Sequence, residues 1–303
     1  VLIGEGTYTS DHRDGVLCIM RSGTKDAWIT WKAIKGQYPV IHPTNWAGIR
    51  IQGSYHVIDG LRIIGLNDSL CLKNAIADLK GSPTGMYNTN GIFVEGRDNA
   101  VDQKPHHIVI RNCEVGKCGG GGITGIECDY LTVEDCEVHD NAWYMRYAGS
   151  GITTLNLWKF DDEPGYHIII QRNKVWNNRC LVSWEKTGKL SDGNGILLDV
   201  TNRDGQTTTN PDGDAIVETA KKKAINPANA KRPVWNNRSL VAHNISVFNG
   251  GSGIHCFRTA HVDIVNNTAY WNGTSVDYAE IFSNNSYDVT IRDNIMVPRP
   301  GGR

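Results

Sequence analysis

The sequence predicts an all-β, single-domain parallel β-helix with long loops that flank one of its strand sheets. Two short phrases recur in step along the chain, and runs of good helix formers are almost absent. Phrases that repeat at a fixed spacing are typical of solenoids, whose strands stack about 4.8 Å apart. We expect one domain over 1–303, with capping strands over about 1–47, stacked coils over 48–297 and an inserted loop over 201–236.

The first phrase is a small residue followed by Ile and a brief strand, and the second ends in Asn or Cys after two polar residues. The Ile positions are Ile49, Ile92, Ile123, Ile152, Ile196, Ile254 and Ile281. The second phrase ends at Cys113, Cys136, Asn173, Asn244, Asn267 and Asn294, and five residues later come Cys118, Asn141, Asn178, Asn249 and Asn272. We expect the Ile side chains to form one inward column. The Asn residues are expected at left-handed bends, bonded to the next coil.

The chain has eight cysteines and no Cys-x-x-Cys pair, so a zinc ribbon is not expected. Cys113 and Cys136 occupy positions where later coils have Asn. We therefore expect them to be small buried residues stacked on one another, and a disulfide between them is the alternative.

Composition excludes several classes of function. Net charge is -1 with a pI near 6.8, whereas nucleic-acid binders normally carry a basic excess. No apolar run approaches the roughly 20 residues that span a bilayer. No signal peptide is visible at the start, and we expect the native gene product to extend beyond one or both ends of this sequence. The oligomeric state is left open.

The spacing of the phrases locates the insertions. From Ile to the following Asn or Cys the bare coil takes thirteen residues, as between Ile254 and Asn267. The longest additions, 180–191 and 201–236, lie on either side of the strand that begins at Ile196. Long loops in compact domains are usually functional, so we expect them to wall a groove. Lids or packing material without chemistry are the alternative.

Strand alternation predicts which side chains face that groove. If each Ile points inward, the next residue points outward. Asp199 and His255 then lie on neighbouring coils and face the same side, where we expect them within hydrogen-bond reach.

The first coils resemble a known group of proteins. Residues 3–41 contain Gly6-Thr7-Tyr8, Ser22-Gly23-Thr24 and a paired strand motif from Ile29 to Ile41. This opening resembles that of secreted right-handed β-helix carbohydrate-active proteins, and the later coils are most similar to family-nine pectate lyases.

In those lyases one coil carries tandem aspartates that hold calcium, and the next carries Gly-Phe-Lys, whose lysine is the base. The corresponding residues here are Ser191-Asp192-Gly193 and Gly253-Ile254-His255, with one aspartate and a histidine. The resemblance implies a secreted or periplasmic enzyme acting on an acidic polysaccharide, with calcium as the candidate cofactor.

Position and resemblance together assign the candidate site. His255 is the expected base, Asp199 orients it or positions substrate, and Asp192 holds the loop or calcium. The candidate substrate-binding residues are Arg258, Lys186, Lys189, Trp184 and Glu95. The candidate metal ligands are Asp192, Asp199 and Asp162. Trp184 is equally well explained as a buried loop anchor, and 161–163 as a solvated turn.

These residues predict a polysaccharide lyase that removes the C5 proton of a uronic acid. A β-helix glycoside hydrolase is the alternative, with Asp199 paired to either Asp192 or Glu95. A third reading is a glycan-binding β-helix without catalysis.

Overall fold

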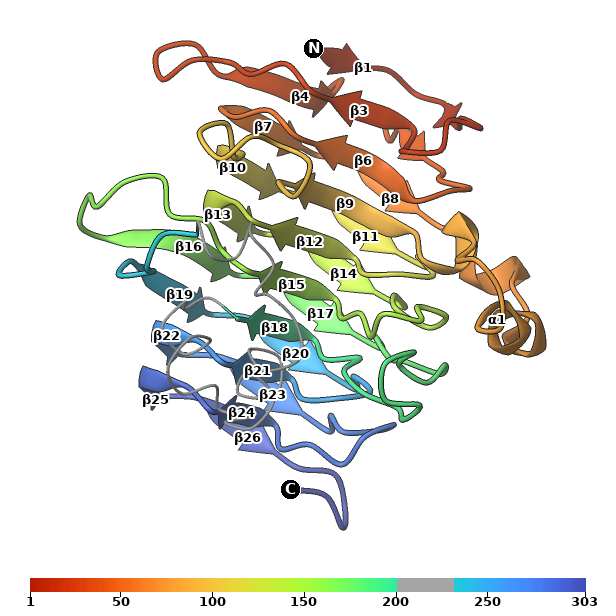
Figure 1. Ribbon diagram of the computed structural model, residues 1–303, viewed down its shortest axis with the longest axis vertical. Coiled ribbons are helices and arrows are strands. Elements are labelled where there is room, and N and C mark those ends of the chain that lie inside the picture. Colours follow the sequence, from red (N-terminus) through yellow and green to blue (C-terminus); the bar gives the residue numbers. More distant parts are fainter. Residues whose placement is uncertain (201–231) are drawn as a thin grey trace, which may run out of the picture.

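The computed structural model of the chain describes residues 1–200 and 232–303. These residues form one parallel β-helix in which successive coils pass through three sheets in turn (Figure 1). This confirms the expected fold class, and the crossovers have the right-handed sense that parallel strands favour. No helix in the described ranges is long and apolar enough to cross a membrane.

Sheets A and B have nine strands each. Sheet A comprises β1 (Leu2–Ile3), β4 (Ile29–Ala33), β7 (His56–Asp59), β10 (His106–Arg111), β13 (Asp129–Glu134), β16 (Tyr166–Gln171), β19 (Arg238–Ala242), β22 (Ala260–Val265) and β25 (Tyr287–Arg292). Sheet B comprises β2 (Thr7–Tyr8), β5 (Val40–Ile41), β8 (Arg62–Ile64), β11 (Glu114–Gly116), β14 (Glu137–His139), β17 (Lys174–Trp176), β20 (Ile245–Val247), β23 (Thr268–Tyr270) and β26 (Ile295–Val297). Residues 1–47, expected as capping strands, thus already contribute to the sheets.

Sheet C has eight strands and carries the Ile phrase. It comprises β3 (Leu17–Ile19), β6 (Ala47–Ile51), β9 (Asn90–Glu95), β12 (Ile123–Ile126), β15 (Ile152–Leu155), β18 (Ile196–Asp199), β21 (Ile254–Phe257) and β24 (Ile281–Asn284). The Ile residues pair rung by rung from Ile49 to Ile281 and are buried in the core. The single inward column is therefore confirmed.

The Asn ladders are also confirmed, with one correction. The Asn244 Oδ1 accepts bonds from both the backbone N and the Nδ2 of Asn173, each at 3.0 Å, and Asn244 in turn donates to Asn267. The left-handed bend is not at the Asn but one residue earlier, as at Arg172 (φ 55°) and His243 (φ 57°). The bend turns the chain so that the next side chain points inward, where its amide replaces water as the partner of buried backbone groups.

The cysteines follow the preferred expectation. All eight are free, and six of them are buried. Cys113 and Cys136 lie at the start of the ladder and contact backbone carbonyls through sulfur, at 3.8 Å to Ile58 and 3.7 Å to Ile110. The disulfide alternative is not formed.

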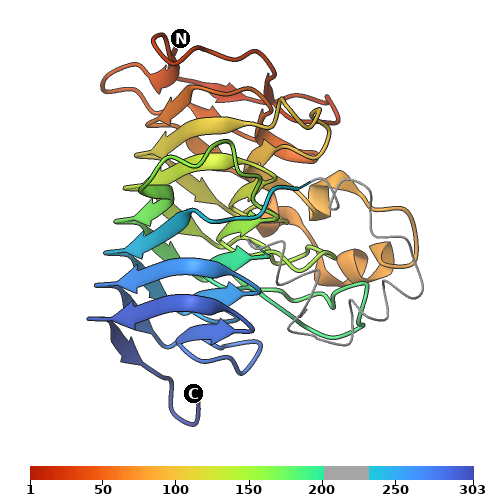
Figure 2. The ribbon, with the colours of Figure 1, turned by 60° about the vertical axis from the view of Figure 1, so that its left-hand side comes forward.

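The insertions concentrate at the two corners that border sheet C. The corner entering sheet C carries 65–89, which contains two 3₁₀ turns (Asn67–Ser69 and Gly85–Tyr87) and the helix α1 (Leu72–Asp78). Figure 2 shows this insertion projecting from the side of the coil stack. The corner leaving sheet C carries 96–105 and 156–165. Long connections thus flank one sheet, as predicted.

The expected loop 201–236 falls mostly outside the described residues. Its last residues pack against the coils: Trp235 is fully buried in the core, and the Arg232 guanidinium donates to Asn156 and to the Val200 carbonyl.

Candidate functional site

The candidate site lies on the outer face of sheet C near its C-terminal end. His255 is the second residue of β21 and pairs across the rungs with Leu197 of β18 and Phe282 of β24. Asp199 ends β18 and pairs with Phe257. Both side chains alternate with inward core residues, so the strand pattern places them on the outer face, as the sequence predicted.

The expected hydrogen bond between Asp199 and His255 is not formed. Neither ring nitrogen of His255, nor the Oδ1 of Asp199, has a hydrogen-bond partner among the described residues. The reason is register: Asp199 lies opposite Phe257, so His255 is one rung and two residues away. That diagonal separates their Cα atoms by roughly 8 Å.

The imidazole of His255 is enclosed by aromatic rings. Its centroid lies 4.8 Å from that of Phe282, 5.6 Å from Tyr278 and 6.0 Å from Phe257. The residue is only 5% exposed. Burial without a compensating partner lowers the pKa of His255 to about 4. The imidazole is therefore neutral at neutral pH.

The pKa values of Asp199 and Asp192 shift in the opposite direction, upward. Burial, together with the charge of Asp192, raises the pKa of Asp199 to about 7, against opposing contributions from Arg258 and Lys186. Burial raises the pKa of Asp192 to about 6. Asp192 accepts hydrogen bonds from Ser191 (3.3 Å) and Asn194 (3.1 Å). Asp199 thus exchanges its proton near neutral pH, whereas Asp192 is tied into the loop that enters β18.

The predicted cations lie at different places around the site. The Arg258 guanidinium lies over the ring of Phe257 at 4.5 Å, one residue beyond β21. The Lys186 ammonium lies 5.4 Å from the centre of the Trp184 ring, on the loop entering β18. Lys189 closes that loop through its carbonyl, which accepts from the Trp184 backbone N at 2.9 Å. Arg258 and Lys186 act electrostatically on Asp199.

Glu95 does not belong to this site, which corrects the sequence interpretation. It shares an outward column with Asp199, but three rungs separate the two residues. Three rungs are about 14 Å, beyond the separation of paired glycosidase carboxylates. Glu95 is also buried and makes a bidentate ion pair with Arg97. The alternation of outward residues repeats on every coil, so it could not tell distant rungs from near ones.

Asp162 is likewise engaged elsewhere. Its carboxylate pairs with Lys159 at 2.5 Å, and its side chain is 71% exposed. Within the described ranges no three His, Cys, Asp or Glu side chains gather as a metal site. Calcium takes six to eight oxygen ligands, which can include backbone carbonyls, amide oxygens and water as well as carboxylates. A calcium role for Asp192 and Asp199 stays a prediction.

Tyr278 is a site residue that the sequence interpretation missed. It lies in the connection 271–280, half-buried, with its ring beside His255. A signal was present, because the path from Asn267 to Ile281 is four residues longer than the bare path from Asn244 to Ile254. These extra residues lie at the corner where the chain enters sheet C, as do residues 180–191, so both connections border the same side of the site.

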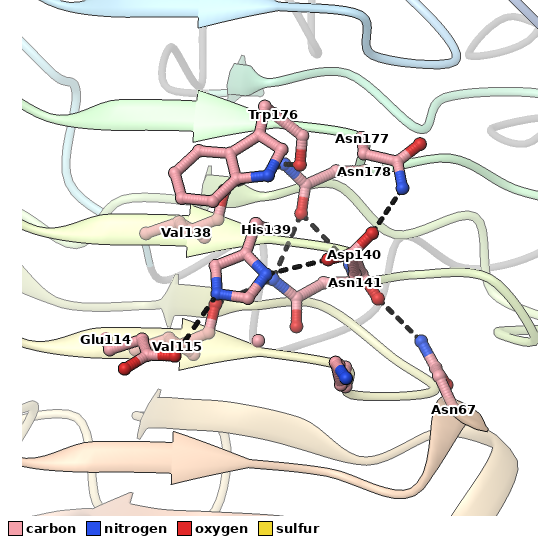
Figure 3. A network of polar contacts seen from close by, with 12 residues as sticks. Asn67, Glu114, Val115, Val138, His139, Asp140, Asn141, Trp176, Asn177 and Asn178 are labelled. Atoms are coloured by element: carbon pink, nitrogen blue, oxygen red, sulfur yellow. Dashed lines mark hydrogen bonds and ion pairs between the residues drawn. The ribbon is translucent and has the colours of Figure 1, made fainter. Parts of the chain in front are cut away.

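A second polar network lies at the corner between sheets B and C (Figure 3). The His139 ring stacks on Trp176 at 4.5 Å, and its Nδ1 lies 2.8 Å from the Asp140 carboxylate. Although burial acts to raise it, hydrogen bonds from His139 and Asn177 lower the pKa of Asp140. The Asn67 amide donates to the Asp140 carbonyl at 2.6 Å. This network holds the insertion that carries α1 against the coils. The polar groups of the network therefore serve a structural role.

Comparison with known proteins places the chain near several solved structures. No family model matches it, and no curated protein matches it. Pectate lyase Pel9A is 14% identical with a TM-score of 0.48, covering 97% of this chain and 68% of that chain. The A-module of the Azotobacter vinelandii mannuronan C-5 epimerase AlgE4 is 14% identical with a TM-score of 0.44, covering 93% and 71%. An alginate lyase from a Paenibacillus species is 11% identical with a TM-score of 0.42, covering 99% and 90%.

Proposed function

We propose that the chain is a polysaccharide lyase that cleaves a uronic-acid-containing glycan by β-elimination on the outer face of sheet C. The observation that carries this proposal is His255, a buried imidazole whose two nitrogens have no hydrogen-bond partner among the described residues. Buried polar groups in proteins are almost always bonded, so an unbonded imidazole needs an explanation, such as a catalytic role, a bound water or a ligand. An imidazole poised to accept a proton from substrate meets that need.

The protonation state of His255 suits a base. Its pKa of about 4 keeps the lone pair free at neutral pH. A uronate carboxylate bound nearby raises the pKa of a neighbouring imidazole through its charge, which strengthens the base once substrate is present. The base therefore becomes effective in the complex.

β-Elimination also requires a site that stabilises negative charge. Removing the C5 proton pushes charge onto the attached carboxylate, and cations or hydrogen-bond donors must meet it. Arg258 follows β21 directly, and Lys186, on the loop that enters β18, acts through its charge on Asp199. Asp199, protonated in part near neutral pH, donates a hydrogen bond to the same carboxylate. Its role is to position substrate, since it does not contact His255.

We infer that the enzyme works outside the cytoplasm, because a polymer of acidic sugars does not cross a membrane unaided. This placement rests on the proposed substrate.

The test is to offer a panel of uronate polysaccharides and to follow ultraviolet absorbance of the new C4–C5 double bond together with new reducing ends. A lyase produces both signals. New ends without absorbance would show a hydrolase, and retention of glycan with neither signal would show a binding protein. Parallel assays with a chelator and with added Ca²⁺ test the calcium prediction.

The matched variants are His255→Ala and His12→Ala. Loss of a general base costs about 10²–10⁴-fold in rate, so His255→Ala should lose nearly all elimination while the protein stays folded. His12 is exposed near the N-terminus and its variant should keep wild-type activity. Near-wild-type activity of His255→Ala would contradict the assignment of the base.

A glycoside hydrolase that uses Asp192 and Asp199 is the second candidate. The favouring observation is that both carboxyls have raised pKa values and that Asp192 acts electrostatically on Asp199. A carboxylic acid that keeps its proton near neutral pH is typical of glycosidase acids. In that case Asp192→Asn would abolish the release of reducing ends, and His255→Ala would not.

A further inference from the structure

Three of the connections that enter sheet C pack against one another and form what we call the entry wall. In chain order they are 65–89, 140–151 and 177–195. They share a small hydrophobic core outside the coils, in which Ala75 of α1, Tyr144 and Val182 are buried. The helix α1 accordingly lies beside the connections that enter β15 and β18 (Figure 1, Figure 2). The entry wall is therefore one packed unit rather than three separate loops.

Glycines allow the first connection to cross a rung and reach the second. The coil between them enters sheet C through 117–122, which has four consecutive glycines at 119–122. A Cβ added at Gly119 would lie 2.6 Å from the carbonyl oxygen of Met86, and one at Gly120 would lie 2.5 Å from that of Asn88. Side chains at these positions would force the first connection away from the coils. Their absence brings the end of α1 close to the second connection.

Arg146 is the polar centre of the entry wall and is only 6% exposed. Its two terminal nitrogens donate to the carbonyls of Asp78 (3.2 Å), Leu79 (3.0 Å) and Gly81 (2.9 Å), at and just beyond the end of α1. Its Nε donates to the Glu185 carboxylate at 2.8 Å. The backbone N of Glu185 in turn donates to the Arg146 carbonyl at 2.9 Å. One arginine thus joins all three connections.

The third connection carries charges that act on the candidate site. Glu185 is followed directly by Lys186, whose charge acts on Asp199. Because Glu185 is bonded to Arg146 through both its backbone and its side chain, Arg146 fixes the residue that precedes this lysine. The planar guanidinium suits this task, since it makes several hydrogen bonds in one rigid arrangement.

We propose that Arg146 is a positioning residue for substrate, which anchors 177–195 on the end of α1 and so holds Lys186 where a uronate carboxylate binds. The inference rests on the proposed lyase function for the identity of that substrate. Arg146 is buried and acts through Lys186. A cation that is already held in place loses less conformational freedom when the carboxylate arrives. The entry wall therefore serves affinity for the acidic glycan.

The experiment compares wild-type protein with Arg146→Lys, Glu185→Ala, the double variant and the control Arg62→Lys. Lysine keeps the charge of Arg146 but cannot reproduce its set of bonds. Glu185→Ala cuts the link to the third connection and leaves Arg146 bonded to α1, so it tests the inference even if Arg146→Lys does not fold. Arg62 makes a comparable pair with Glu114 on sheet B, away from the site.

Kinetics on a uronate polymer that the wild type cleaves give the first readout. We expect each single variant to raise KM about tenfold, the effect of losing one charge-assisted contact, with kcat within about twofold of wild type. The double variant should be no worse than the more affected single variant, because both changes break the same link. Arg62→Lys should keep the wild-type KM. A wild-type KM in Glu185→Ala would overturn the inference, as would a loss of kcat with KM unchanged.

The second readout does not depend on catalysis. Burial raises the pKa of Asp199 to about 7, and the charge of Lys186 is among those that oppose the rise. Displacing Lys186 should therefore raise the pKa of Asp199 further in Glu185→Ala, as followed by carbon NMR of aspartate-labelled protein with Asp199→Asn for assignment. A contribution to stability alone would not move this titration.

Failure of the lyase proposal gives a different result. Wild-type protein would then cleave no uronate polymer by elimination, and the titration of Asp199 would decide the role of Arg146 by itself. A shifted titration in Glu185→Ala would support that role, and an unchanged one would overturn it.

Discussion

The imidazole of His255 stacks on the phenyl ring of Phe282, with centroids 4.8 Å apart and planes inclined by 30°. The two residues pair across adjacent strands, so the contact is set by the register of the coils. An apolar ring on one face withholds water from the imidazole and disfavours its charged form. Phe282 is therefore expected to set the pH range over which His255 can act.

Replacing Phe282 with Ser should move the acid limb of the pH profile. Water at the exposed ring would raise the pKa of His255 from about 4 toward its ordinary value of 6.5. Because the base must be neutral, kcat/KM at pH 5 should fall by up to roughly thirtyfold relative to wild type, with little change at pH 8. An acid limb that stays in place in Phe282→Ser would show that this ring does not tune His255.

Asp199→Asn should stabilise the fold increasingly as pH rises. The folded state holds the Asp199 proton up to about pH 7, whereas the unfolded chain releases it near 3.8. Stability contributed by the protonated form is complete below pH 3.8 and is lost as pH rises to about 7. Asn does not titrate, so its melting temperature relative to wild type should rise by at least about 2 °C between pH 4 and pH 8. A difference that shrinks with pH would contradict the raised pKa.

Removing an Asn from the middle of the ladder should destabilise the protein more than removing one from its end. Asn244→Ala leaves the backbone N of Asn173 and the carbonyl of Ile170 buried without partners. Each such group costs about 1–3 kcal/mol, so we expect the free energy of unfolding in urea to fall by at least about 2 kcal/mol. Asn294 makes equivalent bonds but is half-buried, and water can replace it. Asn294→Ala should therefore cost clearly less, and equal losses would contradict the ladder's role.

Thiol titration should separate two cysteines from six. Only Cys18 and Cys71 are exposed, and no disulfide joins any of the eight. Burial raises the pKa of Cys118 to about 12, and the thiolate is the reactive form. A thiol reagent should modify two groups in the folded protein and all eight in denaturant, with or without prior reduction. Fewer than eight in unreduced, denatured protein would reveal a disulfide.

The fold could be predicted because the same pattern of buried and hydrogen-bonded residues repeats in every coil of the β-helix. Each rung must bury an Ile such as Ile196 and satisfy a bend with an Asn such as Asn244, so the same local demand recurs along the chain. The insertion 180–191 was predicted as a departure from a constant spacing, whereas the insertion 65–89 and the longer connection 271–280 were not predicted. The position of the left-handed residue was missed because bend and ladder are adjacent, and sequence alone does not separate them.

The candidate site could be predicted only in part. Outward alternation placed Asp199 and His255 on one face, but it also admitted Glu95, which lies three rungs away. Alternation has a period of two residues and carries no information about which rung a residue occupies along the stack. Counting coils between the residues would have removed Glu95.

By itself the sequence determined that this chain is a solenoid, which residues fill its core, and which sheet its long loops border. Those properties depend on short-range patterns that each coil must satisfy separately. Only the tertiary structure decided that Asp199 stands diagonal to His255 and that Tyr278 reaches the imidazole from another loop. It also decided that Asp192 is engaged with its own loop. Those relationships depend on strand register and on the paths of non-repeating loops, which bring together residues far apart in the chain.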